Sequence, residues 1–140
     1  MTEPSLSARS DSRPRRPALV IGNEDHEKLL ALGLAGAGSE AGDDLLDEVE
    51  RARVVPQAKL PADAVRMGAR VTYRAGATTR TVTLVYPADA DISAGRVSVL
   101  TPIGTALIGL RAGQKIGWED RNGHPQMLEI VSVEAPVGAN

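Results

Sequence analysis

Several stretches within residues 69–133 alternate apolar and polar residues with the two-residue period of β-structure. Ala69, Val71 and Tyr73 occupy every second position of one such stretch, and Val82 and Leu84 do the same in the next. Small residues separate these stretches at 75–77, and Asn122-Gly123 separates the last two, as is typical of β-turns. The pattern predicts an antiparallel sheet of about five strands. The predicted strands are residues 69–74, 81–86, 97–99, 115–119 and 126–133.

One stretch within this region, residues 98–113, changes from strand to helix spacing. Thr101 is placed to cap a helix with its hydroxyl, and Pro102 follows at the first helical position, where its missing N–H costs nothing. Apolar residues then recur at helical spacing, at Ile103, Ala106, Leu107 and Leu110. A short helix is therefore expected between the third and fourth strands. If Val97 and Val99 face the core, Ser98 faces away from it, and Leu100 and Pro102 form an apolar spot on the surface.

The first half of the chain has helical patterning. Asn23 is expected to cap a helix that ends near Ala35, because Gly33, Gly36 and Gly38 disfavour its continuation. A second helix is expected to begin within 40–43 and to end near Arg53. Two helices joined by a short glycine-rich turn predict an antiparallel hairpin. Arms of about a dozen residues reach only about 18 Å.

These patterns divide the chain into four segments. Residues 1–17 contain four Arg but a single Leu, and we interpret them as a disordered basic arm. Residues 18–60 comprise a short apolar lead-in, the helical hairpin and a linker. Residues 61–135 form the β-domain, with an α+β fold, and residues 136–140 form a tail.

The composition of the chain argues against several classes of function. The chain of 140 residues has a formal net charge of -2, which does not favour general or sequence-specific nucleic-acid binding. It has no Cys, so disulfides, thiolate metal sites and a cysteine nucleophile are excluded. No apolar run is long enough for a membrane span, so a cytoplasmic location without membrane contact is expected. Cofactors and metal ions are not expected.

Several motifs resemble one family. Residues 98–109, Ser-Val-Leu-Thr-Pro-Ile-Gly-Thr-Ala-Leu-Ile-Gly, resemble the signature of the C-terminal domain of the Gre transcription factors. Residues 45–56, 65–74 and 83–88 extend the likeness in the same order, from about Leu19 to Val133. Within that family the likeness is closer to the regulators of nucleoside diphosphate kinase. The resemblance implies an FK506-binding-protein-like fold for the β-domain, which would have one short helix.

The resemblance also implies a partner. In Gre factors the start of this helix contacts RNA polymerase at the rim of its secondary channel. Leu100 stands where the family commonly has an acidic or amide residue, and Gln114 stands where it usually has Asp. The partner is expected to be retained while the chemistry of the contact differs. The residues assigned to polymerase binding are Leu100, Thr101, Pro102, Gly104 and Thr105.

The sequence gives less support to a catalytic function than to polymerase binding. Gre factors carry metal-binding acids at the tip of a long finger, and Glu40, Asp43 and Asp44 lie near the predicted hairpin tip. The hairpin is less than half as long as such a finger, so helix capping is the simpler role for these acids. Prolyl isomerase activity needs an aromatic pocket, but the chain has only Trp118 and two Tyr. His26 and His124 lack ligand spacing and are expected to face solvent.

These observations predict a monomeric, non-enzymatic protein that binds RNA polymerase and competes with Gre cleavage factors. Two alternatives remain. One is that the chain is itself a cleavage factor. The other is that it regulates nucleoside diphosphate kinase levels indirectly, through transcription. A nucleotide site is not predicted, since Gly36 to Gly38 lie between helices without the strand that a phosphate loop requires.

Overall fold

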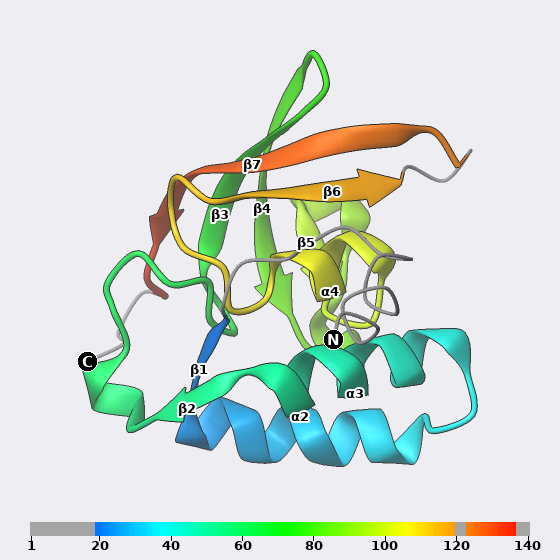
Figure 1. The fold of residues 1–140 in the computed structure, drawn as a ribbon, viewed down its shortest axis with the longest axis vertical. Coiled ribbons are helices and arrows are strands. Elements are labelled where there is room, and N and C mark those ends of the chain that lie inside the picture. Colours follow the sequence, from blue (N-terminus) through cyan, green and yellow to red (C-terminus); the bar gives the residue numbers. More distant parts are fainter. Residues whose placement is uncertain (1–18, 120–122, 137–140) are drawn as a thin grey trace, which may run out of the picture.

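A computed structural model describes residues 19–119 and 123–136. The arm expected at 1–17, Asn122 of the expected turn and nearly all of the expected tail lie outside the described residues. The described chain begins with β1 (Val20–Gly22), α2 (Asn23–Ala35), α3 (Glu40–Arg51) and β2 (Arg53–Val55). A five-stranded sheet with one short helix follows, so the protein combines helices and sheet, as expected (Figure 1).

The five strands of the large sheet are β3 (Arg70–Ala75), β4 (Thr78–Val85), β5 (Arg96–Ser98), β6 (Lys115–Glu119) and β7 (Pro125–Glu134). Their order in space is β5-β4-β3-β7-β6. The hairpins β3–β4 and β6–β7 are antiparallel, as the alternation predicts, and β7 also pairs antiparallel with β3.

The expectation of a wholly antiparallel sheet is wrong at one pair. Strands β4 and β5 are parallel, with Leu84 opposite Val97. Between them the chain makes two short 3-10 turns, Pro87–Asp89 and Ile92–Ala94, and returns alongside the last residues of β4. Because this loop reverses the chain twice, β5 enters the sheet in the direction of β4.

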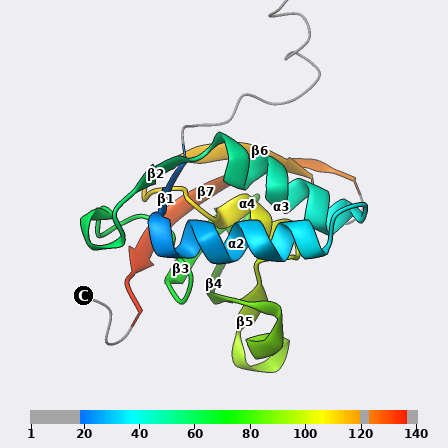
Figure 2. The same cartoon turned by 90° about the horizontal axis from the view of Figure 1, so that it is seen from below.

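The helical pair lies along the β-domain. Helices α2 and α3 run side by side in opposite directions, with α4 (Pro102–Leu107) between them and the sheet (Figures 1 and 2). Leu29, Leu45 and Val49 are fully buried in the same apolar core as the sheet residues. The pair is thus a packed layer of the domain, which its short arms and apolar inner side make possible.

Glycines let the two helices approach closely. A Cβ on Gly42 would overlap the carbonyl oxygen of Gly36, and a Cβ on Gly33 would lie 2.8 Å from the Leu46 side chain. Ser39 caps α3 by accepting a hydrogen bond from the Gly42 N–H at 3.1 Å. Helix α3 begins at Glu40, within the expected range, and ends at Arg51, two residues earlier than expected.

The start of α2 and the end of α3 are held together by contacts that the sequence interpretation missed. The apolar lead-in forms β1, which pairs in parallel with β2 just after α3. Asn23 is the first residue of α2 and does not cap it, contrary to expectation. Instead, Gln57 Oε1 accepts hydrogen bonds from the N–H groups of Glu24 and Asp25, at 3.0 and 3.2 Å. Asn23 Oδ1 accepts in return from the Gln57 N–H at 2.8 Å.

Candidate functional site

The turn that begins α4 is held by a dense set of hydrogen bonds. Thr101 caps the helix as predicted, since its Oγ1 accepts from the Gly104 N–H at 3.1 Å. The same hydroxyl donates to the Ser98 carbonyl at 2.7 Å. Ser98 Oγ accepts from the Leu100 N–H at 3.0 Å. Because Pro102 occupies the first helical position, it leaves no unpaired donor there. The turn is therefore well defined before any partner binds.

Exposure differs among the residues assigned to polymerase binding. Pro102 is exposed, whereas Thr101 is half-buried. Leu100 is also half-buried and packs against the core, so it offers less surface than its place in the alternation predicts. Ser98, expected to face away from the core, is buried, because its hydroxyl and carbonyl serve the turn.

Gly104 and Thr105 lie beneath this surface. Both are buried, and Thr105 Oγ1 donates to the Val99 carbonyl at 2.7 Å. A Cβ on Gly104 would overlap the Ser98 carbonyl oxygen and approach Val99 Cα to 2.9 Å. These two residues thus hold the turn that presents Pro102, and they offer no surface of their own.

Gln114 lies in the turn after α4. Its Oε1 accepts from the Arg111 N–H at 2.8 Å, and the Arg111 side chain pairs with Asp63 at 2.9 Å. This Gln therefore makes a local contact within the domain.

The acids expected at the hairpin tip are exposed at the start of α3. Asp43 Oδ1 accepts from the Gly38 N–H at 3.0 Å, which is a capping contact. Carboxylates in this first turn also interact favourably with the helix dipole. Within residues 19–119 and 123–136 no group of three or more His, Cys, Asp or Glu side chains is arranged to hold a metal ion.

The remaining polar candidates are scattered. His26 is half-buried on α2, while His124 is exposed near the start of β7, so the first departs from the expected exposure. Tyr73 is buried in the core, and Tyr86 packs against it.

No helix in the described part of the chain is long and apolar enough to cross a membrane.

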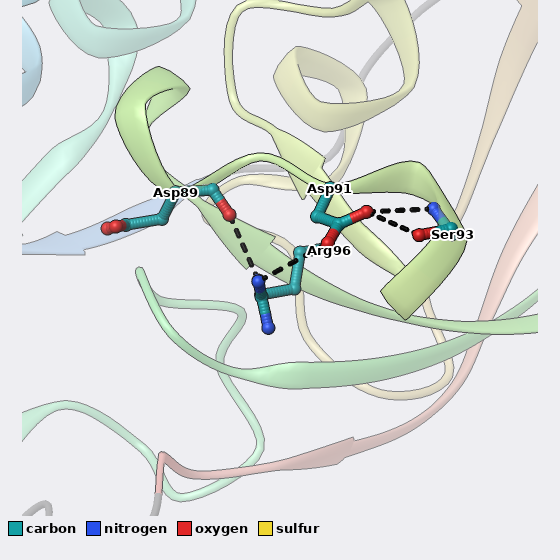
Figure 3. Close-up of polar contacts among 4 residues, drawn as sticks. All are labelled: Asp89, Asp91, Ser93 and Arg96. Atoms are coloured by element: carbon teal, nitrogen blue, oxygen red, sulfur yellow. Dashed lines mark hydrogen bonds and ion pairs between the residues drawn. The ribbon is translucent and has the colours of Figure 1, made fainter.

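The loop before β5 carries an arrangement that the sequence interpretation passed over (Figure 3). Asp91 caps the second 3-10 turn, accepting from the Ser93 N–H at 3.1 Å and from Ser93 Oγ at 2.7 Å. Arg96 donates to the Asp89 carbonyl at 3.0 Å and lies 3.6 Å from the Asp91 carboxylate. The hydrogen bond from the Ser93 hydroxyl lowers the pKa of Asp91 most, and the Ala94 N–H and the charge of Arg96 lower it further. An Asp two residues before a Ser is a signal for such a turn.

Comparison with known proteins places these features in a family. Residues 60–135, more than half of the chain, match the family described as transcription elongation factor, GreA/GreB, C-term. The chain is 37% identical over 123 residues to the Regulator of nucleoside diphosphate kinase of Escherichia coli K12, an alignment that covers 85% of this chain and 90% of the relative.

Two further relatives agree. The chain is 41% identical over 75 residues to transcription elongation factor GreA of Rhodospirillum rubrum, covering 52% of this chain and 48% of that factor. The solved structure of a prokaryotic transcription elongation factor GreA/GreB from Nitrosomonas europaea matches with a TM-score of 0.69 and 36% identity, covering 86% of this chain and all of that one. These relatives are named as regulators and elongation factors. The chain belongs to the GreA/GreB family of transcription elongation factors.

Proposed function

We propose that the chain is a non-enzymatic regulator of transcription, of the same type as the Regulator of nucleoside diphosphate kinase (Rnk), which binds core RNA polymerase near the rim of its secondary channel. The β-domain docks through the start of α4, and Pro102 is the central contact. The observation that carries this proposal is the turn around Thr101, which presents an exposed proline from a fixed frame. The family match across residues 60–135 supports the choice of partner.

Regulation would follow from competition. A monomer bound at the rim leaves fewer polymerase molecules available to Gre cleavage factors, in proportion to its concentration and affinity. The helical pair lies along the β-domain with arms of 13 and 12 residues, so it covers the channel entrance without reaching the catalytic centre. Direct contact with nucleic acid is not part of the proposal.

A cleavage activity of its own is less well supported. Asp43 is engaged in capping, and the short helical pair packs along its own domain. The name of the Escherichia coli relative favours an effect on nucleoside diphosphate kinase. Such an effect would arise through transcription, as a consequence of polymerase binding.

Binding and competition test the proposal together. The full chain is titrated against core RNA polymerase alongside Pro102→Asp and a control, Pro56→Asp, which alters another exposed proline far from α4 along the chain. Thermal melting first establishes that each variant is folded. Pro102→Asp is expected to weaken binding at least tenfold, while Pro56→Asp binds like the wild type.

Cleavage of a backtracked transcript by a Gre factor is then measured with increasing protein. Inhibition is expected from the wild type and the control. Failure to inhibit at saturating protein refutes competition. If the protein instead stimulates cleavage, and changing Glu40, Asp43 and Asp44 to Ala abolishes the stimulation, the chain is a cleavage factor.

A further inference from the structure

The loop between β4 and β5 presents one apolar side chain to solvent. Ile92 is 87% exposed, the highest value among the large apolar residues that the structure describes. It lies at the start of the Ile92–Ala94 turn. In Figure 2 this loop projects from the body of the domain, on the side of α2 that faces away from α3.

The loop holds its shape without the Ile92 side chain. Asp91 binds the N–H and the hydroxyl of Ser93, and Arg96 ties the loop to its own first turn through the Asp89 carbonyl (Figure 3). The backbones of Asp91 and Arg96 also exchange hydrogen bonds of 2.9 Å in both directions. Gly95 closes the turn in the left-handed conformation, with φ of 75°. The Gly95 N–H donates to the Ile92 carbonyl at 3.0 Å, but none of these contacts uses the Ile92 side chain.

A rigid loop with an exposed apolar tip is well suited to binding. A loop whose backbone is already held in place loses little further backbone freedom when a partner covers its side chain, so more of the burial energy appears as affinity. Scattered single apolar residues are common on surfaces. Ile92 differs because the hydrogen-bonded frame around it fixes the backbone that carries it.

The surroundings of Ile92 indicate which partner it meets. Strand β5 has three residues, about 10 Å, and it leads directly from this loop to the turn that presents Pro102. The Asp91 carboxylate is paired with Arg96, whereas the Asp89 carboxylate makes no hydrogen bond or ion pair within the described residues. In Figure 3 the Asp89 side chain points away from the network. The complementary surface is therefore an apolar pocket with a basic side chain beside it.

We infer that Ile92 is a second anchor for the partner that binds at the start of α4. This inference rests on the proposed function, so the partner is RNA polymerase. Pro102 and Ile92 then make two separate contacts, with the short strand β5 as the spacer. Asp89 contributes charge complementarity at the edge of the second contact.

The test compares variants of the full chain in binding to core RNA polymerase. Ile92→Ser removes the apolar side chain without adding charge, and Ile92→Asp adds a charge that opposes burial. Met127→Ser is the matched control, because Met127 is also exposed but lies on β7 in another part of the sheet. Asp89→Lys tests the charge. Melting temperatures establish that all variants remain folded, since none of these side chains supports the loop.

The inference predicts at least a tenfold loss of affinity for Ile92→Ser, a larger loss for Ile92→Asp, and no change for Met127→Ser. Asp89→Lys should weaken binding about threefold or more at low salt, with less effect at high salt. If Pro102→Asp weakens binding but both Ile92 variants bind like the wild type, the second anchor is refuted and the proposed function stands. If the wild-type protein does not bind polymerase, both are refuted.

Discussion

The close approach at Gly104 offers a sharp test of how the turn before α4 is held. Gly104→Ala adds one methyl group where the backbone of Ser98 and Val99 leaves no space. The Ser98 carbonyl oxygen that it would meet also accepts the hydrogen bond from the Thr101 hydroxyl. Since the obstacle is backbone, a side-chain rotation cannot relieve it, and either the helix start or the strand end must move.

The size of the effect follows from these contacts. Overpacking at a filled site costs about 1–3 kcal/mol. Displacement of α4 also weakens the Thr101 cap, worth about 1 kcal/mol. Alanine gains about 1 kcal/mol over glycine in helix propensity, which offsets the cap. The net loss is about 2 kcal/mol, which lowers Tm by roughly 5–10 °C in a chain of this size.

Thermal unfolding followed by circular dichroism measures this change. Gly36→Ala is the matched control, because a Cβ there meets its nearest neighbour, Gly42 Cα, at an ordinary 3.5 Å. The control should melt within about 2 °C of the wild type. If Gly104→Ala melts as the wild type does, the turn is not held by the close approach described, and the rigidity argued for Pro102 loses its basis.

Three further predictions concern other parts of the fold. Gln57→Ala leaves the N–H groups of Glu24 and Asp25 without their acceptor, and should lower the free energy of unfolding by about 1–2 kcal/mol in urea; an unchanged midpoint would contradict the capping role. Tyr86→Phe removes a buried hydroxyl that has no hydrogen-bond partner among the described residues, so stability at neutral pH should stay level or rise by up to about 1 kcal/mol. Burial, followed by the charge of Asp25, raises the pKa of Tyr86 to about 12 from its ordinary value of 10.0. Tyr86 therefore ionises at lower pH in the unfolded chain, and stability falls as the pH rises from 10 to 12. The Phe variant should lose less stability than the wild type over this pH range, and equal losses would refute the raised pKa of Tyr86. Asp43→Ala should reduce stability by about 0.5–1 kcal/mol through loss of the Gly38 contact, and it should leave polymerase binding unchanged, which a titration checks.

Local signals in the sequence predicted the capped start of α4. A Thr followed by Pro before an apolar helical stripe is sufficient for a capped helix, because every partner lies within a few residues. The same holds for the antiparallel pairs β3–β4 and β6–β7, whose strands are adjacent in the chain. These contacts need no information from the rest of the fold.

Contacts between distant residues explain most of the errors. Asn23 looks like a cap in isolation, but Gln57, 34 residues away, takes the acceptor role. The strands β1 and β2 have three residues each, too few to show a period, and they pair only because the helical pair brings them together. The parallel entry of β5 depends on a loop whose turns are set by Asp91 and Gly95, and alternation alone does not reveal its direction.

Burial at the site itself was only partly predictable. The period-two pattern placed Ser98 outside and Leu100 on the surface, but the turn needs both polar groups of Ser98, which are therefore drawn inward. Leu100 consequently covers part of the core. Ile92 gave no periodic signal at all, since its exposure follows from a loop shaped by polar contacts.

The most direct test of the account is equilibrium binding of the full chain to core RNA polymerase, with wild type, Pro102→Asp and Pro56→Asp compared at one salt concentration. The account predicts saturable binding by the wild type and by Pro56→Asp, and at least a tenfold weaker affinity, about 1.4 kcal/mol, for a folded Pro102→Asp. Absence of wild-type binding at tens of micromolar, or equal binding by all three proteins, would contradict it.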